Sequence, residues 1–206
     1  MPRPFNDYER DRLREKLVEA GKRLLNRVGL RGLVVDDIAR EAGISKGSFY
    51  AFFPSKEDFV LSVFEEWEER YRGALLDDLR DGPGTGHERL ERFFSGIFEL
   101  FEREPGLARL GFVDIMHIME RLPPERLAAH QANDARSIGE AAKGWAENGI
   151  VKEADLPAIE GILDSLFILA MHRDDFKPES YAPAMRLLAE ALAMRLSPKG
   201  GDGETA

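Results

Sequence analysis

The chain of 206 residues contains no cysteine. This absence excludes disulfide bonds, thiolate metal sites and a cysteine nucleophile, and it fits a reducing compartment. Long apolar runs are missing as well: the longest, residues 166–171, has six residues, against the ~20 that a bilayer-spanning helix needs. The first twenty residues carry charges throughout and lack the apolar core and cleavage site of a secretory signal. We therefore expect a globular protein that has no membrane span and stays in the cytoplasm.

Sequence motifs of the common enzyme classes are also absent. The chain has no G-x-S-x-G nucleophile elbow, no phosphate-binding glycine loop and no H-E-x-x-H pair. Its adjacent acidic pairs, Asp77-Asp78 and Asp174-Asp175, are better explained as solvated surface than as acid/base machinery. We therefore expect no enzyme activity, no catalytic residue and no cofactor.

The formal net charge of −9 argues at first against a nucleic-acid partner, because phosphate binding depends on lysine and arginine. The charge is unevenly divided along the chain, however. Residues 1–58 hold twelve lysines and arginines against ten aspartates and glutamates, whereas the rest holds seventeen against twenty-eight. A mildly basic N-terminal part is what we expect if only that part approaches a polyanion and the acidic remainder is repelled by it.

Helical periodicity runs through almost the whole chain, with apolar residues three and four positions apart and no alternating strand pattern. Glycine, proline and capping residues divide this pattern into predicted helices, which cover residues 11–27, 35–42, 46–53, 55–79, 87–103, 107–119, 125–148, 156–172 and 181–196. We predict an all-α fold of about nine helices. The helix over 87–103 has an apolar face too wide for packing on one side, so we expect it to be central.

These helices divide into two predicted domains and a tail. Residues 1–54 form a three-helix, helix-turn-helix, DNA-binding domain, and residues 55–198 form a ligand-binding and dimerisation domain. Residues 199–206 are polar and rich in glycine, which predicts a disordered tail.

The segment over residues 36–53 fits a helix-turn-helix for packing reasons. Ala39 is small where two helices must cross closely, and Gly43 suits the left-handed conformation that ends the first helix. Ile38, Ile44 and Phe49 can fill the space between the two helices. Ser45 is a good N-cap for the second helix, and it leaves the N-terminal end of that helix exposed, where recognition helices touch bases.

Six residues at or near this end are the predicted DNA contacts. They are Lys46, Gly47, Ser48, Tyr50, Ala51 and Lys56. Lys46 adds a full charge to the partial positive charge of the helix N-terminus, Gly47 lets the backbone approach, and Ser48 can bond a base edge. Tyr50 and Lys56 are plausible phosphate donors that flank the groove. The alternative is a helical hairpin in an all-α core, with both lysines merely solvated.

This segment resembles the DNA-binding head of the tetracycline-repressor (TetR) family of transcriptional regulators. The resemblance covers roughly the first sixty residues and is carried by Gly29, Val35, Asp37-Ile38-Ala39, Ala42-Gly43-Ile44-Ser45-Lys46-Gly47, Phe49-Tyr50, Phe53 and Lys56-Glu57. It implies a three-helix head, a long fourth helix that leads into a ligand-binding body, and a homodimer whose grip on its operator changes when a small molecule binds.

The sequence departs from the family's usual pattern at two places, one of which is a pair of residues. Leu33 and Val34 stand where the family usually has two threonines, the second of which commonly caps the next helix and touches a phosphate. Ala51 stands where histidine is frequent, so its contact should be weak or apolar, to a thymine methyl for example. Upstream, the arginines at positions 3, 10, 12 and 14 are better explained as a solvated helix start than as a minor-groove arm.

The predicted effector cavity is lined by aromatic, methionine and a few polar side chains. Its residues are Trp67, Tyr71, Phe94, Phe98, Asp114, Met116, His117 and Trp145. Aromatic and methionine side chains suit bulky apolar ligands, although for any single one of them ordinary core is the favoured interpretation. Asp114 and His117 share one helical face, and a metal site there would need His130 or His172 in addition, so we predict none.

The last two predicted helices each carry an apolar stripe suited to association. The dimerisation residues that we predict are Leu163, Leu166, Phe167, Met185, Leu188 and Leu192. Two such helix pairs around a twofold axis would bury both stripes in a four-helix bundle; the alternative is that the stripes pack inward on their own domain, and both arrangements can hold together.

Taken together, these features predict a homodimeric repressor that binds a palindromic operator in double-stranded DNA and is released by a small, largely apolar effector. A ligand-independent or corepressor-dependent DNA-binding regulator is the alternative.

Overall fold

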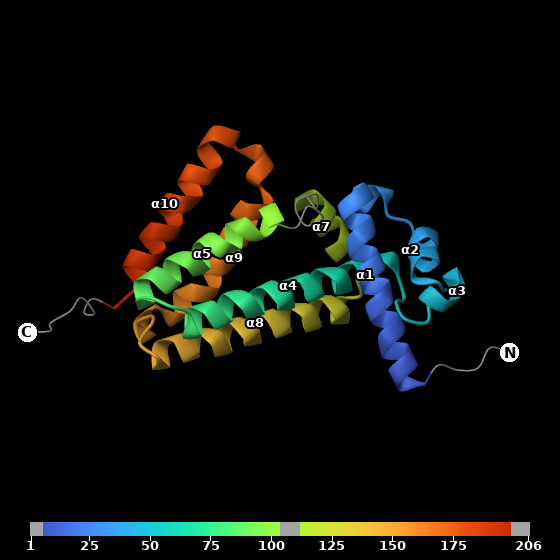
Figure 1. Ribbon diagram of the computed structural model, residues 1–206, viewed down its shortest axis with the longest axis horizontal. Coiled ribbons are helices and arrows are strands. Elements are labelled where there is room, and N and C mark those ends of the chain that lie inside the picture. The colour runs from blue at the N-terminus through green and yellow to red at the C-terminus, as the bar shows by residue number, and fades with distance from the viewer. Residues whose placement is uncertain (1–5, 104–111, 199–206) are drawn as a thin grey trace, which may run out of the picture. The chain divides into compact units, whose positions relative to one another are not determined.

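A computed structural model of the protein describes residues 6–103 and 112–198 (Figure 1). All regular structure among these residues is helical, which confirms the all-α prediction. The α-helices are α1 (Asp7–Gly32), α2 (Val35–Ala42), α3 (Lys46–Phe49), α4 (Lys56–Asp81), α5 (Gly86–Arg103), α7 (Phe112–Met119), α8 (Pro124–Glu147), α9 (Leu156–Met171) and α10 (Pro178–Leu196), with two short 3-10 helices, η1 (Glu153–Asp155) and η2 (Arg173–Asp175). Within the described ranges, no helix is both long and apolar enough to cross a bilayer.

The predicted helix boundaries agree closely with the observed ones. α2 spans the predicted residues, and α5, α8 and α9 differ from prediction by no more than one residue at either end. α1 begins earlier than predicted because Asn6 and Glu9 form a capping box, in which each side chain accepts a hydrogen bond from the other's backbone N–H. The predicted tail over 199–206 and the first part of the predicted helix over 107–119 lie outside the described residues.

The chain divides into two compact units. Among the described residues, the head unit comprises 6–69 and 112–123, and the body unit comprises 70–103 and 124–198. α4 begins in the head unit and ends in the body unit. The head unit therefore extends beyond the N-terminal domain predicted over 1–54, because it also takes in the first half of α4 and all of α7.

The head unit is built around three phenylalanine rings. Phe49 of α3, Phe59 of α4 and Phe53 of the segment between these helices are almost completely buried, with ring centroids 4.9 to 5.6 Å apart. Burial of each ring contributes about 1.5–3 kcal/mol, and edge-to-face contact adds to this. Gly21 of α1 lies against the Phe59 ring, where an added Cβ would stand 2.5 Å from a ring carbon. The rings therefore anchor α3 to the interior of the head unit. α1 packs against α2, and α2 packs against α3 (Figure 1).

A buried ammonium group also connects α1 with α4. Lys22, with 9% of its side chain exposed, donates hydrogen bonds to Glu19 (2.8 Å) and to Glu66 of α4 (2.6 Å). Burial by itself lowers the pKa of an ammonium, but the bonds to the two carboxylates outweigh it, and the pKa of Lys22 lies above its ordinary 10.5. The charge is therefore stabilised inside the unit as long as both partners are ionised.

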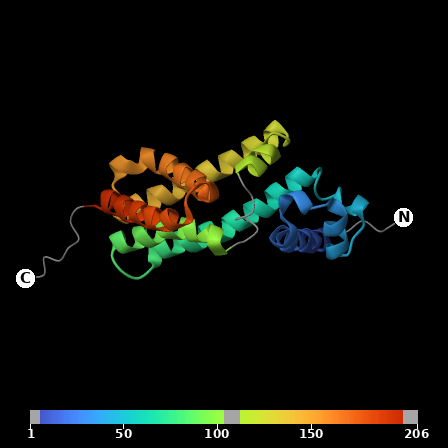
Figure 2. The same cartoon turned by 90° about the horizontal axis from the view of Figure 1, so that it is seen from above.

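The body unit is arranged around α5, as the wide apolar face of that helix predicted. α5 packs against both α10 and α9, and α9 packs against α8 (Figures 1 and 2). Phe93, Phe94 and Phe98 of α5 are buried, and the Phe93 ring lies 5.1 Å from that of Trp145 in α8. These rings form the core of the unit.

The second half of α4 is joined to this core by two ion pairs. Arg72 contacts Asp134 of α8 at 3.0 Å, and Asp78 contacts Arg92 of α5 at 3.0 Å. Gly96 of α5 faces α4 and admits the side chain of Leu75, since a Cβ at Gly96 would stand 2.4 Å from a Leu75 methyl. α4 and α5 can therefore approach each other closely at this point.

Candidate functional site

The turn between α2 and α3 has the backbone geometry that its sequence predicted. Gly43 ends α2 with φ 76° and ψ 30°, a left-handed conformation that glycine adopts without steric cost. The N–H of Ile44 reaches back to the carbonyl of Ala39 at 2.9 Å, which closes the helix end. The chain thus reverses within three residues and enters α3 at a defined angle.

Ser45 caps α3 as expected. Its Oγ accepts a hydrogen bond from the backbone N–H of Ser48 at 3.1 Å, and the two hydroxyl groups lie 2.9 Å apart. The helix is shorter than the predicted 46–53. It ends at Phe49, and turns follow it before Pro54. A residue before proline avoids the helical region, which shortens the helix from its C-terminal end.

The leading edge of α3 is exposed to solvent. Lys46, Gly47, Tyr50 and Ala51 are exposed, with 47% of Tyr50 accessible, and Ser48 is half-buried. Phe49 points the other way and is completely buried. Five of the six predicted DNA contacts therefore lie together around one short segment, which the buried ring of Phe49 holds in the head unit.

The charge on this edge is partly balanced by α2. The Nζ of Lys46 donates a hydrogen bond to Asp36 at 2.8 Å, and this bond raises the pKa of the lysine. Asp37, next to it, pairs with Arg40. A phosphate that approaches Lys46 must therefore compete with the carboxylate of Asp36, a partner that the sequence analysis did not identify although both residues were in the motif.

Lys56 is the predicted DNA contact that lies apart from the others. Its Nζ donates a hydrogen bond to the backbone carbonyl of Leu30 at 3.3 Å, and the side chain is half-buried. Burial lowers the pKa of this lysine, although Glu57 opposes the shift, and the nearby charge of Arg121 lowers it further. The spacing from α3 to Lys56 is as predicted, but the ammonium group does not extend the exposed edge.

Two of the upstream arginines bind the end of the α3 segment. Arg10 donates to the carbonyl of Ala51 at 3.1 Å and lies over the ring of Phe52. Arg14 donates to Ser62 at 3.3 Å and lies over the ring of Phe53. These contacts brace the segment, and both arginines are exposed, in agreement with the predicted solvated helix start. Arg12 lies over the ring of Tyr8, and the arginine at position 3 lies outside the described residues.

Val34 leaves the first turn of α2 without a side-chain cap. It occupies the N-cap position, makes no capping hydrogen bond and is 47% exposed. The loss of a threonine here therefore removes a contribution that is typically about 1 kcal/mol.

The predicted effector residues are divided between the two units. Trp67, Asp114, Met116 and His117 belong to the head unit, and Tyr71, Phe94, Phe98 and Trp145 belong to the body unit. Trp67, Phe94, Phe98 and Trp145 are buried, whereas 38% of Met116 is exposed. His130 and His172, which a metal site at Asp114 and His117 would have needed, are also in the body unit. That these eight residues line one effector cavity therefore stays a prediction.

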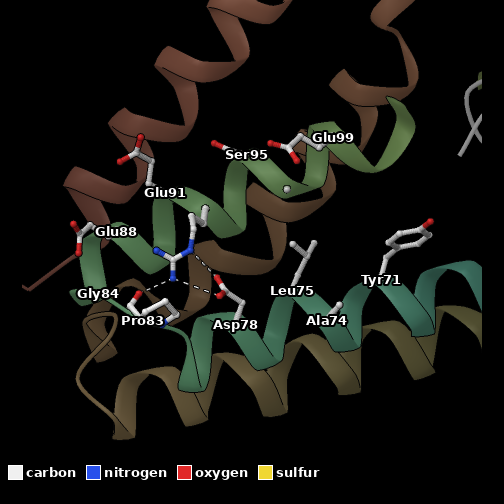
Figure 3. Close-up of a pocket in the computed structure, with 12 residues that line it drawn as sticks. Tyr71, Ala74, Leu75, Asp78, Pro83, Gly84, Glu88, Glu91, Ser95 and Glu99 are labelled. Carbon is white, nitrogen blue, oxygen red and sulfur yellow. Dashed lines mark hydrogen bonds and ion pairs between the residues drawn. The ribbon is translucent and has the colours of Figure 1, made fainter. Parts of the chain in front are cut away.

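Tyr71 lines a groove of about 880 Å³ in the body unit, between the second half of α4 and α5 (Figure 3). Its other lining includes four carboxylates, those of Asp78, Glu88, Glu91 and Glu99. The one arginine of this lining, Arg92, donates to Asp78 and to the carbonyl of Pro83 at 2.8 Å (Figure 3). Hydrogen bonds from the backbone N–H and hydroxyl of Thr85 lower the pKa of Glu88. The groove is thus acidic, unlike the apolar cavity that we predicted.

Phe98 borders a smaller hollow of about 210 Å³ between α5 and α10. Asp114 and His117 line a further hollow of about 340 Å³ in the head unit, together with Lys56 and Arg121. Asp114 and His117, which were predicted to share one helical face, therefore line the same hollow. This hollow lies next to the helix-turn-helix.

The predicted dimerisation stripes face mainly inward. Leu166 and Met185 are buried in the body unit, and Leu163, Phe167, Leu188 and Leu192 are half-buried. The outward face of α10 is a different one, on which Leu187 and Met194 are 66% and 73% exposed, with Ala184 and Ala191 in the same row. The role of the predicted stripes in dimerisation therefore stays a prediction, and a second apolar row is exposed on α10.

Comparison with known proteins agrees with the helix-turn-helix geometry. Residues 17–63 match the family model described as bacterial regulatory proteins, tetR family. The chain is similar to the HTH-type transcriptional repressor DhaR of Mycobacterium sp. (strain GP1), with 33% identity over 90 residues, 44% of this chain and 46% of DhaR. It is also similar to the HTH-type transcriptional repressor NemR of Escherichia coli (strain K12), with 28% identity over 97 residues, 47% of this chain and 49% of NemR. The chain spans about half the length of these curated relatives.

Solved structures extend the likeness to the whole fold. A TetR-family transcriptional regulator from Pectobacterium atrosepticum matches 96% of this chain over 100% of its own length, with a TM-score of 0.74 and 18% identity. A TetR-family regulator from Rhodococcus sp. covers 91% of this chain and 100% of its own, with a TM-score of 0.64 and 18% identity. At such identities the similarity establishes the fold.

Proposed function

Because residues 17–63 match the model of the tetR family of bacterial regulatory proteins, we propose that the chain is a DNA-binding transcriptional regulator of this family. The family and the curated relatives are regulators of transcription and not enzymes. More specifically, we propose a homodimeric repressor that binds a palindromic operator and is released by a small molecule. Its place of action is then the cytoplasm, where bacterial DNA lies.

The observation that carries this proposal is the exposed edge of α3. A short helix capped by Ser45 exposes Lys46 and Gly47 to solvent beside the half-buried Ser48, while Phe49 holds the helix in the head unit. The free end of such a helix suits the major groove, where a hydroxyl can bond a base edge and an ammonium can neutralise a phosphate. Tyr50 and Ala51 extend the same surface, with Ala51 offering a methyl group to a thymine.

A homodimer would give this edge its specificity. Two half-sites one helical turn (~34 Å) apart are read together only when two copies are held at that spacing. The exposed row on α10 supports such an assembly, because Leu187 and Met194 are large apolar side chains that a monomer would leave in water.

The effector would act by binding one arrangement of the dimer better than another. A difference of ~1–3 kcal/mol suffices for a useful switch. Tyr71 in the acidic groove supports an effector there that combines a flat apolar part with a positive charge, in place of the largely apolar molecule that the sequence favoured. Regulation by a corepressor or without a ligand is the second form of this proposal.

A band shift against the DNA upstream of the chain's own gene tests the proposal. We expect the wild type to bind, and Lys46→Ala and Tyr50→Ala to bind at least tenfold more weakly, since a contact to a charged or polar partner is worth about 1.5–3 kcal/mol. Lys143→Ala, on the exposed surface of α8, is the matched control and should bind like the wild type. Wild-type binding no stronger than that of the two α3 variants would overturn the assignment.

A further inference from the structure

The hollow in the head unit is bounded by three elements: the end of α1, the first turns of α4 and α7. Its volume of about 340 Å³ lies at the lower end of the range that small-molecule sites occupy, ~300–1,000 Å³. We refer to it as the head hollow, and its lining consists of Leu30, Arg31, Lys56, Glu57, Val60, Val113, Asp114, His117, Ile118 and Arg121.

Two of its three permanent cations already have acidic neighbours. Arg31 stands 3.9 Å from Asp114, and Arg121 stands 3.6 Å from Glu57. Both distances exceed those of a direct hydrogen bond, so the pairs are loose. Within the described part of the chain, the ammonium of Lys56 has no carboxylate at ion-pair distance and bonds only the carbonyl of Leu30. The lining therefore carries one positive charge that is not balanced by a partner.

This unbalanced charge is in an unfavourable position. Lys56 is half-buried, and burial disfavours its protonated form; the charge of Glu57 opposes this effect, and the positive charge of Arg121 adds to it. An anion placed between the two cations would relieve their repulsion and replace the water that Lys56 lost on burial. Lys56 and Glu57 also open α4, and a helix N-terminus adds partial positive charge.

Part of the remaining lining is apolar, which narrows the chemistry of the occupant. Leu30, Val60 and Ile118 line the same space, and the last two are almost completely buried. An ion with a single charge matches the single unbalanced ammonium, and an attached short hydrocarbon chain matches the apolar walls. Inorganic phosphate carries more charge than the lining balances and has nothing to place against these side chains.

From these observations we propose that the head hollow binds a small organic monoanion, a short-chain carboxylate, with its carboxylate between Lys56 and Arg121 and its hydrocarbon chain against Val60 and Ile118. This site is separate from the acidic groove of the body unit, whose lining carries the opposite charge. Asp114 and His117 border the hollow and form part of its polar rim. They do not form the primary ion pair with the bound carboxylate.

Occupation of the hollow acts on the DNA-binding edge. The end of α1 leads within a few residues into α2, and α4 begins a few residues after α3, so two walls of the hollow are continuous with the helix-turn-helix. A carboxylate that binds the ammonium of Lys56 competes with the carbonyl of Leu30. This competition changes the position of the end of α1 relative to the start of α4. This regulatory part rests on the proposed function, whereas the binding itself does not.

Calorimetric titration of the full chain, without DNA, tests the binding. The probes are acetate, butyrate, hexanoate, hexanamide and inorganic phosphate. We expect affinity to rise from acetate to hexanoate and hexanamide not to bind. We also expect Lys56→Gln and Arg121→Gln each to weaken hexanoate by on the order of tenfold, because each removes a charge-assisted bond. Lys56→Arg should stay within a few-fold of the wild type, and Lys143→Gln should be unchanged.

The outcomes separate the site from its alternatives. Equal binding of hexanamide and hexanoate, or hexanoate binding that neither Lys56→Gln nor Arg121→Gln weakens, overturns the proposal. Phosphate binding as tightly as hexanoate overturns the assignment to an organic carboxylate. Because Arg121 is 57% exposed, its variant should fold even if the Lys56 variant does not.

A band shift with and without hexanoate then tests the coupling. A change in operator affinity that is lost in Arg121→Gln supports it, and an unchanged affinity at saturating hexanoate overturns the regulatory part while the binding result stands. If no operator is bound at all, the proposed function fails, and the calorimetry still decides whether the hollow is a carboxylate site.

Discussion

Lys46 is the residue on which the DNA-binding edge depends most, and it does not act alone. Its ammonium is bonded to Asp36, so part of its attraction for phosphate is spent within the head unit. Asp36 itself is exposed and would stand close to the phosphates that Lys46 meets. A carboxylate at this place lowers affinity for every DNA sequence and thereby favours sites that offer good base contacts as well.

We predict that Asp36→Asn raises affinity for both operator and unrelated DNA by about two- to fivefold, the range expected for loss of an exposed ion pair. The measurement is a fluorescence anisotropy titration at low salt. Asp77→Asn removes the same charge from an exposed position on α4 and should leave affinity unchanged. Weaker binding by Asp36→Asn would mean that the carboxylate positions Lys46 for DNA rather than competing with it.

Two glycines of the motif have different physical roles. Gly43 has a positive φ, so Gly43→Ala should lower the free energy of unfolding by about 1 kcal/mol. Gly47 lies in α3, and the nearest atom to an added Cβ is Ser45 Oγ at 3.9 Å. Gly47→Ala should therefore not reduce stability, yet it should weaken operator binding if the DNA backbone approaches closely there. Thermal melts and band shifts of both variants decide this, and full binding by a stable Gly47→Ala would refute a close approach at that residue.

At the scale of elements, the connection between α1 and α4 is governed by one buried charge. Lys22 is held by Glu19 and Glu66, both about half exposed. The loss of stability therefore depends on whether the lysine or the glutamates are removed. Lys22→Met leaves carboxylates that water can solvate, whereas loss of both glutamates leaves a buried ammonium without an acidic partner.

We predict that the double variant Glu19→Gln with Glu66→Gln loses about 1–3 kcal/mol of stability and that Lys22→Met loses less. Because the folded pKa of Lys22 is raised above 10.5, this stabilisation is complete below that pH and is lost as pH rises through the higher folded value. Denaturant unfolding at neutral and alkaline pH should show that the difference between wild type and Lys22→Met shrinks in the alkaline range. A difference that is constant or grows would contradict the role of the charge.

The element scale also shows the limits of periodicity. The repeat in α10 predicted a helix and a dimerisation stripe through Met185, whereas the large apolar residues that the structure leaves exposed on this helix are Leu187 and Met194. Likewise α3 was predicted too long, since the apolar residues after Phe49 continue the helical spacing although Pro54 already restricts the backbone.

At the scale of the whole molecule, the exposed row on α10 bears on assembly. We predict that Leu187→Glu converts a dimer into a monomer, because it places a charge in an interface that would bury this side chain. Size-exclusion chromatography with light scattering measures the mass directly. Gln131→Glu adds the same charge to the exposed surface of α8 and serves as the control. An unchanged mass for Leu187→Glu would remove α10 from the proposed interface.

The local features of this protein could be predicted from its sequence. Gly43, Ser45 and Phe49 specify a turn, a cap and an anchor through interactions with residues at most a few positions away, so the helix-turn-helix and the exposure of its edge follow from the order of residues alone. The all-helical class follows in the same way, because the apolar spacing is repeated in every long segment.

Other features required the tertiary structure, because they depend on residues far apart in the chain. Lys56 lies beside Leu30 and Arg121, Arg10 donates to Ala51, and Lys46 bonds Asp36 across the turn. The spacing of residues along the sequence does not predict any of these contacts. The division of the predicted effector residues between two units has the same origin. A periodic pattern shows that a helix has an apolar face, but the partner of that face is chosen by the packing of the whole chain.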